Sequence, residues 1–148
     1  MNALLGKLAA GCAALTLISS AALAKSGWGE DYEKALAQAK TEKKMVLLDF
    51  TGSDWCPWCI KLDKEVFATK EFQSYAKDNL ILVEVDFPQS KSQEKKLKEQ
   101  NEKLQSQFGI QGYPTVVVLS AGGKKLGELG YEKGGPAAFI SKLNALKK

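Results

Sequence analysis

The fold of this chain is decided by residues 45–59, which read MVLLDFTGSDWCPWC. The first six residues are apolar apart from Asp49, so they predict a strand that is buried on both faces. Residues 51–54 predict a turn. Pro57 is typical of the first turn of a helix, where its missing N–H costs nothing. The stretch therefore predicts a strand, a turn and a helix that begins at the cysteine pair.

The remainder of the chain predicts further helices and strands in alternation. Helical spacing of apolar residues, turn residues and runs of β-branched residues place helices at 32–44, from 69, at 91–108 and from 134, and strands at 80–87, 115–119 and 125–131. Residues 121–124 predict a hairpin turn, and Gly109 predicts a helix cap. This order predicts an α/β fold in which a mixed central sheet is flanked by helices on both faces.

The composition suits one compact globular domain and excludes several classes of function. The chain has 148 residues, of which 45% are hydrophobic and 26% charged. All 21 basic residues are lysine, and there is no histidine, which excludes histidine-dependent hydrolases, histidine-ligated metal sites and arginine-clamped phosphoryl transfer. The net charge of +4 is modest and interspersed with acids, so we expect no nucleic-acid partner.

Residues 1–24 have the pattern of a cleaved signal peptide. Lys7 is followed by an apolar run over 8–18 and by the small-residue cleavage pattern Ala22-Leu23-Ala24. The domain is therefore expected to span 25–148. An uncleaved membrane anchor is the alternative, although the run is shorter than the ~20 residues that a spanning helix needs. Cys12 faintly resembles a lipoprotein acceptor, but the apolar run continues past it.

Two separate pieces of the sequence resemble the thioredoxin superfamily. Residues 49–59 are followed some fifty residues later by Gly112-Tyr113-Pro114-Thr115, which opens a strand. The Phe-Thr-Gly-Ser-Asp-Trp-Cys run is similar to small exported bacterial thioredoxin-like proteins that act on disulfides. The resemblance covers essentially all of the expected mature chain. It implies a thioredoxin-like fold and a redox-active disulfide between Cys56 and Cys59.

The cysteine pair predicts disulfide exchange on chemical grounds as well. Cys56 precedes the helix, where the first N–H groups stabilise a thiolate, so we expect it to be the nucleophile. Cys59 lies three residues later, within reach of the Cys56 sulfur, and is expected to resolve the mixed disulfide. In the absence of histidine, Asp49 is the candidate proton acceptor, because burial in an apolar strand raises the pKa of a carboxyl group. The alternative is an ordinary surface acid at a strand end.

The expected substrate cleft surrounds this pair. The resemblance implies that the Tyr113–Pro114 peptide bond is cis and that Tyr113 offers its backbone to an extended substrate. Trp55 and Trp58 are expected to flank the cleft together with Pro57, although both indoles could instead be packing residues. Asp54 and Lys61 are expected to be solvated charges.

These observations predict a periplasmic thiol-disulfide oxidoreductase, and a reductase in particular. Strongly oxidising relatives carry a histidine between the cysteines, whereas this chain has Pro57-Trp58 there. No part of the sequence indicates a flavin or nicotinamide site, so we expect no cofactor and no metal, and instead a membrane protein that supplies electrons. We expect a monomer that acts on protein disulfides or thiols. An oxidase, an isomerase, and a chaperone or binding module with an inert disulfide remain as alternatives.

Overall fold

The computed structural model describes residues 25–147 of the chain. The expected signal peptide, which contains Cys12, lies outside the described residues. Within the described part, no helix is both long enough and apolar enough to cross a membrane.

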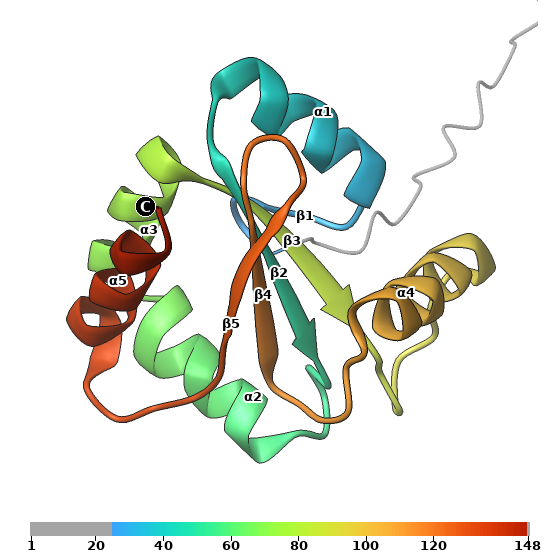
Figure 1. The fold of residues 1–148 in the computed structure, drawn as a ribbon. Coiled ribbons are helices and arrows are strands. Elements are labelled where there is room, and N and C mark those ends of the chain that lie inside the picture. The colour runs from blue at the N-terminus through green and yellow to red at the C-terminus, as the bar shows by residue number, and fades with distance from the viewer. Residues whose placement is uncertain (1–24, 148) are drawn as a thin grey trace, which may run out of the picture.

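A single mixed sheet forms the centre of the molecule (Figure 1). Its strands are β1 (Trp28–Gly29), β2 (Met45–Thr51), β3 (Leu80–Asp86), β4 (Thr115–Leu119) and β5 (Lys125–Leu129). They lie in the order β1-β3-β2-β4-β5. The pairs β1–β3 and β2–β3 are parallel, whereas β2–β4 and β4–β5 are antiparallel. The mixed sheet confirms the prediction, and β1 was not predicted because two residues are too short to show a pattern.

Helices cover both faces of the sheet, as predicted (Figure 1). They are α1 (Tyr32–Glu42), α2 (Pro57–Leu62), the π-helix η1 (Asp63–Phe67), α3 (Lys70–Asn79), α4 (Lys95–Phe108) and α5 (Gly135–Leu146). One buried cluster joins the sheet to α2, η1, α3 and α5 through residues such as Phe67, Phe72 and Phe139. A second cluster joins the other face to α1 and α4 through Ala35, Ala39 and Leu104.

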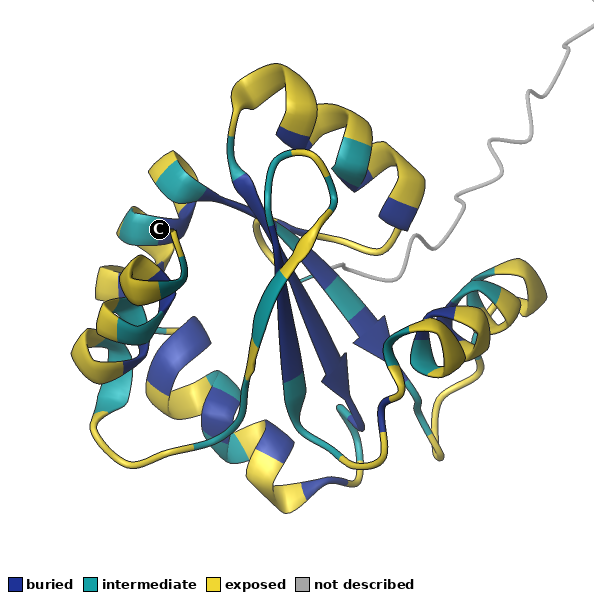
Figure 2. Ribbon diagram, in the orientation of Figure 1, coloured by how far each residue is buried: buried dark blue, intermediate teal, exposed yellow. Residues whose placement is uncertain are grey.

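Strand β2 is buried along its whole length between these two layers (Figure 2). Successive side chains of a strand point to opposite faces. Leu47 belongs to the cluster on the α2 side, whereas Leu48 and Phe50 belong to the cluster on the α1 side. Asp49 therefore points to the α2 side of the sheet. The same alternation in β3 directs Glu84 to that side, because Leu80 belongs to the α2-side cluster.

The structure corrects the predicted start of the fourth helix and the prediction for Asp54. Helix α4 begins at Lys95 instead of residue 91, and the residues before it form a loop. The Asp54 carboxylate accepts hydrogen bonds from the backbone N–H groups of Gln89, Ser90 and Lys91 at 3.0, 2.7 and 3.0 Å. Asp54 thus binds the backbone of this loop instead of being a solvated charge.

Strand β5 also ends earlier than predicted, at Leu129 instead of residue 131. Tyr131 lies beyond the end of the strand, and its hydroxyl donates a hydrogen bond of 2.6 Å to Glu65 of η1. At the end of α4 the prediction is confirmed, because Gly109 has a φ of 65° and its N–H bonds to the carbonyl groups of the last turn.

Candidate functional site

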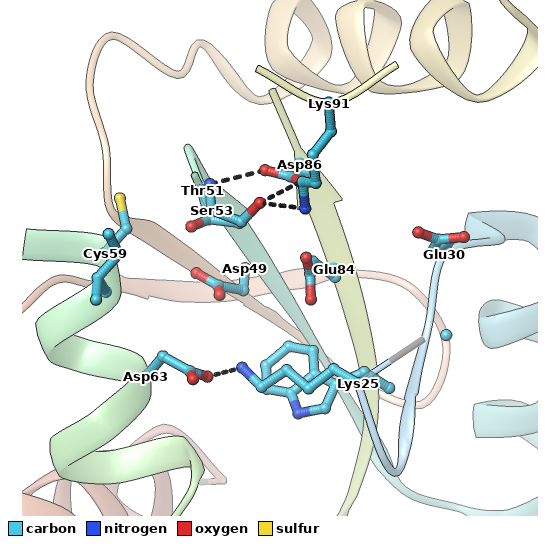
Figure 3. Close-up of a pocket in the computed structure, with 13 residues that line it drawn as sticks. Lys25, Glu30, Asp49, Thr51, Ser53, Cys59, Asp63, Glu84, Asp86 and Lys91 are labelled. Carbon is cyan, nitrogen blue, oxygen red and sulfur yellow. Dashed lines mark hydrogen bonds and ion pairs between the residues drawn. The ribbon is translucent and has the colours of Figure 1, made fainter. Parts of the chain in front are cut away.

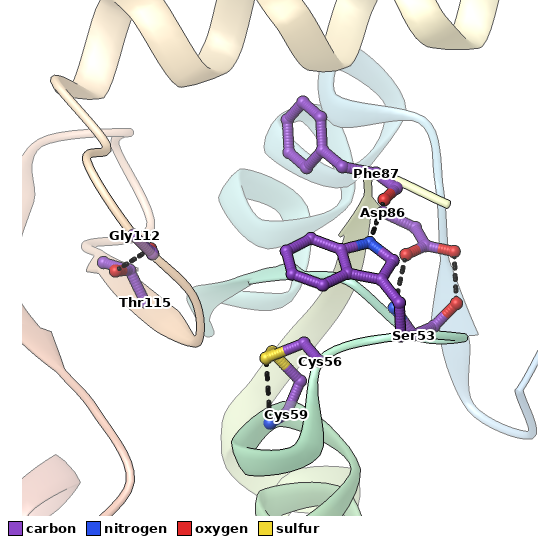
Figure 4. The surroundings of a disulfide bond; sticks show 8 residues. Ser53, Cys56, Cys59, Asp86, Phe87, Gly112 and Thr115 are labelled. Atoms are coloured by element: carbon purple, nitrogen blue, oxygen red, sulfur yellow. Dashed lines mark hydrogen bonds between the residues drawn. A yellow bond between two sulfur atoms is a disulfide. The ribbon is translucent and has the colours of Figure 1, made fainter. Parts of the chain in front are cut away.

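Cys56 and Cys59 form a disulfide at the start of α2 (Figure 4). Their Cα atoms are 5.3 Å apart. Cys56 is the N-cap of the helix, and its sulfur accepts the backbone N–H of Cys59 at 3.3 Å. Pro57 occupies the first helical turn, as predicted. A Cys56 thiolate formed on reduction would therefore face helical N–H groups that stabilise a negative charge.

Trp55 is held against the neighbouring loops although part of it remains accessible. Its indole Nε1 donates a hydrogen bond of 2.8 Å to the carbonyl of Phe87, and its ring meets Tyr113 edge-on at 5.9 Å between centroids. Tyr113 in turn stacks on Phe87 at 5.2 Å. With 38% of the residue exposed, Trp55 both packs and borders the site, so both interpretations from the sequence apply.

Trp58 forms a second aromatic surface beside the disulfide. It is 55% exposed, and its ring lies 5.1 Å from that of Tyr131. The ammonium group of Lys61 lies 5.2 Å from the Trp58 ring centroid and 5.3 Å from the Tyr131 centroid. Lys61 is therefore more than a solvated charge, because a cation over two rings attracts both.

The Tyr113–Pro114 peptide bond is cis, as the resemblance implied. The Tyr113 hydroxyl accepts a hydrogen bond of 2.6 Å from Gln105, and Thr115 donates one of 2.7 Å to the carbonyl of Gly112. In Figure 4 the loop that carries Gly112 and leads to Thr115 of β4 lies across from the disulfide. The two sequence pieces that carried the resemblance thus meet at one site.

Asp49 lies behind the disulfide and is only 5% exposed, so the interpretation as a surface acid is wrong. Its Oδ1 atom has no hydrogen-bond partner among the described residues. Burial is the main cause that raises its pKa from 3.8 to about 7. Asp49 and Cys59 both line a cavity of about 360 Å³ (Figure 3). A carboxyl group with this pKa can exchange a proton near neutral pH.

Sequence reasoning missed the charged groups that share this cavity with Asp49. They are Lys25, Glu30, Asp63, Glu84, Asp86 and Lys91. Burial raises the pKa of Glu84 as well. The period-two pattern of residues 80–86 carried a signal for Glu84 and Asp86, because it places both on one face of the strand. The register of β3 against β2 makes that face the one of Asp49. Lys25 precedes β1 and carried no such signal.

Asp86 differs from Asp49 because both of its carboxylate oxygens have hydrogen-bond partners. It accepts hydrogen bonds from the backbone N–H and the hydroxyl of Ser53, at 2.9 and 2.5 Å, and pairs with Lys91 at 3.4 Å. Despite these carboxylates, no group of three or more metal-binding side chains within residues 25–147 is arranged to hold a metal ion.

Comparisons with known proteins place this geometry in a family. The profile of the thioredoxin-like domain matches residues 32–147. The chain is similar to the disulfide bond reductase DsbH of Chlamydia pneumoniae, with 41% identity over 80% of this chain and 72% of that protein. It is also 33% identical to the thioredoxin-related protein DsbJ of the same organism, over 72% of this chain but only 32% of DsbJ. A solved structure of a DsbH oxidoreductase superposes with a TM-score of 0.77 and 39% identity, over 89% of this chain and 91% of the other.

Proposed function

This chain belongs to the thioredoxin-like domain family and is a thiol-disulfide oxidoreductase, and from that premise we propose that it works as a reductase of protein disulfides. The observation that carries the proposal is the placement of the cysteine pair. Cys56 caps α2 on one side, and Cys59 shares a cavity with the unpaired acid Asp49 on the other.

In the first step the reduced enzyme attacks the substrate. The Cys56 thiolate adds to one sulfur of the substrate disulfide, the substrate S–S bond breaks, and one substrate thiolate leaves. The product is a mixed disulfide between Cys56 and the substrate. The helix N-terminus and the Cys59 N–H favour the thiolate form that this step needs.

In the second step Cys59 releases the substrate. The Cys59 thiol gives its proton to the Asp49 carboxylate, and the resulting thiolate attacks the Cys56 sulfur. The second substrate thiolate leaves, and the enzyme ends in the disulfide form seen in the structure. Two electrons have then passed from the enzyme to the substrate.

The surroundings of the disulfide fit an extended polypeptide substrate. Tyr113 offers backbone groups before the cis Pro114, as an edge strand would. Pro57 and the exposed indoles of Trp55 and Trp58 offer apolar contact on either side of the cysteine pair. We infer that these five residues bind the segment that flanks the substrate cysteine.

The reductive direction is supported by two observations. The relative DsbH carries the name disulfide bond reductase. The chain has no histidine, so no imidazolium can stabilise a reduced thiolate as it does in strong oxidants. We further propose that the protein is exported to the periplasm after cleavage behind Ala24, and that a dithiol of a membrane protein reduces it again. One chain suffices for this cycle, since both cysteines and Asp49 belong to it.

The reduction potential tests the direction. We would equilibrate the protein with glutathione or dithiothreitol buffers and follow the fluorescence of Trp55 and Trp58. A reductase is expected to lie near the roughly −270 mV of thioredoxin, whereas a value near the roughly −120 mV of DsbA would identify an oxidant.

A trapping experiment separates an enzyme from a passive binding module. Cys59→Ser removes the resolving thiol, so covalent adducts with exported proteins are expected to accumulate through Cys56. Cys56→Ser is the matched control, since it keeps one thiol at the same site but removes the nucleophile at the helix end. Equal adducts from both variants, or none from either, would contradict the proposed mechanism and favour a binder with an inert disulfide.

A further inference from the structure

Lys25 reaches from the segment before β1 into the cavity behind the disulfide (Figure 3). Its ammonium group forms an ion pair with Asp63 of η1. The same group lies 4.3 Å from the ring centroid of Trp28 and 5.0 Å from that of Phe67. Only 26% of the Lys25 side chain is exposed. One carboxylate and two aromatic rings therefore hold this cation in a fixed place.

The place where Lys25 is held lies below the two acids of the sheet. In Figure 3 Asp49 and Glu84 lie side by side on β2 and β3, and the Lys25 side chain passes beneath them toward Asp63. Burial lowers the pKa of Lys25, and the charges of Asp49 and Glu84 oppose that effect. The attraction acts both ways, because Lys25 also lowers the pKa of Asp49 against the effect of burial.

The charged and titratable groups around Asp49 come from every element that borders the cavity. They are Lys25 and Glu30 beside β1, Cys59 of α2, Asp63 of η1, Glu84 and Asp86 of β3, and Lys91 of the following loop. Of the two cations, Lys91 is 57% exposed and is engaged by Asp86 and by the Ser53 hydroxyl, at 3.4 and 2.8 Å. Among the cations of residues 25–147, Lys25 is thus the one that acts on Asp49.

We propose that Lys25 is a positioning residue for the release step, and that its ammonium ion stabilises the Asp49 carboxylate that receives the proton of Cys59. The inference rests on the proposed function, because it requires Asp49 to be the proton acceptor. The proton moves from the Cys59 sulfur to an Asp49 oxygen, and the negative charge moves to sulfur. Lys25 exchanges no proton or electron with the substrate.

If Lys25 has this role, removal of its charge should change the pH dependence of the release step. Without Lys25, the neighbouring carboxylates and burial would keep a proton on Asp49 at neutral pH, and a protonated Asp49 cannot accept another. The release step of Lys25→Gln is therefore expected to need a higher pH. Glu84 has the opposite charge and the opposite effect on Asp49, so Glu84→Gln is expected to shift the release step to lower pH.

The experiment uses the full reduced chain with Cys12→Ser in every variant, so that Cys56 and Cys59 are its thiols. This chain is mixed with a chromogenic aromatic disulfide in a stopped-flow instrument. Cys56 releases the first aromatic thiolate, and Cys59 releases the second in a slower phase whose rate is measured between pH 5 and 9. For Lys25→Gln the midpoint of the second phase should rise by about one pH unit, which slows release about fivefold at pH 7. For Glu84→Gln the midpoint should fall.

Two further variants separate electrostatics from structure. Lys25→Arg keeps the positive charge and should keep the wild-type midpoint. Lys44→Gln is the matched control, since Lys44 pairs with Glu42 at 2.6 Å but does not line this cavity. An unchanged midpoint in Lys25→Gln, or shifts of equal sign in Lys25→Gln and Glu84→Gln, would overturn the inference.

Asp49→Asn tells a failure of this inference from a failure of the proposed function. If Asp49→Asn leaves the second phase and its pH dependence unchanged, Asp49 is not the proton acceptor, and the proposed release step and the role of Lys25 both fall. If Asp49→Asn slows the second phase while Lys25→Gln changes nothing, only the role of Lys25 is wrong.

Discussion

The two faces of β2 and β3 differ sharply at the end of the sheet that carries the disulfide. Toward α1 and α4 the side chains are apolar and buried, as with Phe50, Val83 and Val85. Toward α2 the same strands carry Asp49, Glu84 and Asp86 around a cavity. Because neighbouring residues of a strand alternate between faces, one stretch of chain supplies both a core and a reactive site.

The two faces contribute differently to the protein: the α1 side stabilises the fold, whereas the α2 side carries the reactive groups. Burial of apolar side chains on the α1 side stabilises the fold. On the α2 side, the unpaired Asp49 costs free energy whenever it ionises, because a buried charge without hydrogen bonds is poorly solvated. Apolar burial on the α1 side must therefore offset the free energy that ionised Asp49 costs on the α2 side.

Removal of a large side chain from the apolar face should have the largest effect. Phe50 is fully buried and meets Phe108 edge-on at 6.2 Å between ring centroids. Phe50→Ala is expected to lower the free energy of unfolding by about 3–5 kcal/mol, because it leaves a cavity. Urea unfolding with the disulfide intact measures this loss. The loss should be equal at pH 4 and pH 8, since the lost contacts are apolar, and a strong dependence on pH would contradict the comparison.

Replacement of Asp49 on the α2 side should instead raise the free energy of unfolding at high pH. Asp49 ionises near 7 in the folded protein but near its ordinary 3.8 when unfolded, so its pKa is raised by folding. Between these values the folded state binds the proton more tightly, and stability falls as the pH rises. Asp49→Asn should therefore stabilise the protein at pH 8 by at most about 4 kcal/mol, less the cost of the buried amide, and bring no such gain below pH 4.

Asp86→Asn is the matched control for this prediction. Asp86 is also buried on the α2 side, but both of its oxygens accept hydrogen bonds from Ser53. An amide would turn one acceptor into a donor, so Asp86→Asn should destabilise the protein by about 1–3 kcal/mol at pH 8. If the two substitutions change the free energy of unfolding equally at pH 8, the lack of hydrogen bonds at Asp49 does not explain the effect of Asp49→Asn.

The sequence predicted the parts of this site that depend on local pattern. The buried strand with one acid, the helix capped by Cys56 and the strand after Pro114 follow from hydrophobic pattern, helix start signals and resemblance. The acids Glu84 and Asp86 were accessible to the same period-two argument, since they alternate with Val83 and Val85.

Other parts depend on contacts between distant segments, which no local pattern encodes. Lys25 reaches Asp63 from 38 positions away in the sequence, where the residues around it show no periodicity. Asp54 looked like a solvated turn residue, because its three backbone donors lie 35 to 37 positions later. The path of a loop decides both contacts, and side-chain chemistry alone does not predict that path.

The smallest effect is expected where the two faces meet, at the turn after β2. Gly52 is packed so closely against Trp55 that an added Cβ would overlap the indole. Gly52→Ala should displace the indole, weaken its 2.8 Å hydrogen bond to Phe87 and cost about 1–2 kcal/mol. A change in Trp fluorescence that accompanies a small loss in urea unfolding would measure it. Gly112→Ala is the matched control, because Gly112 belongs to the opposite loop and has nothing within 4 Å of an added Cβ. If both substitutions are neutral, the indole has another position of equal energy, and Trp55 borders the site without being fixed by the packing at Gly52.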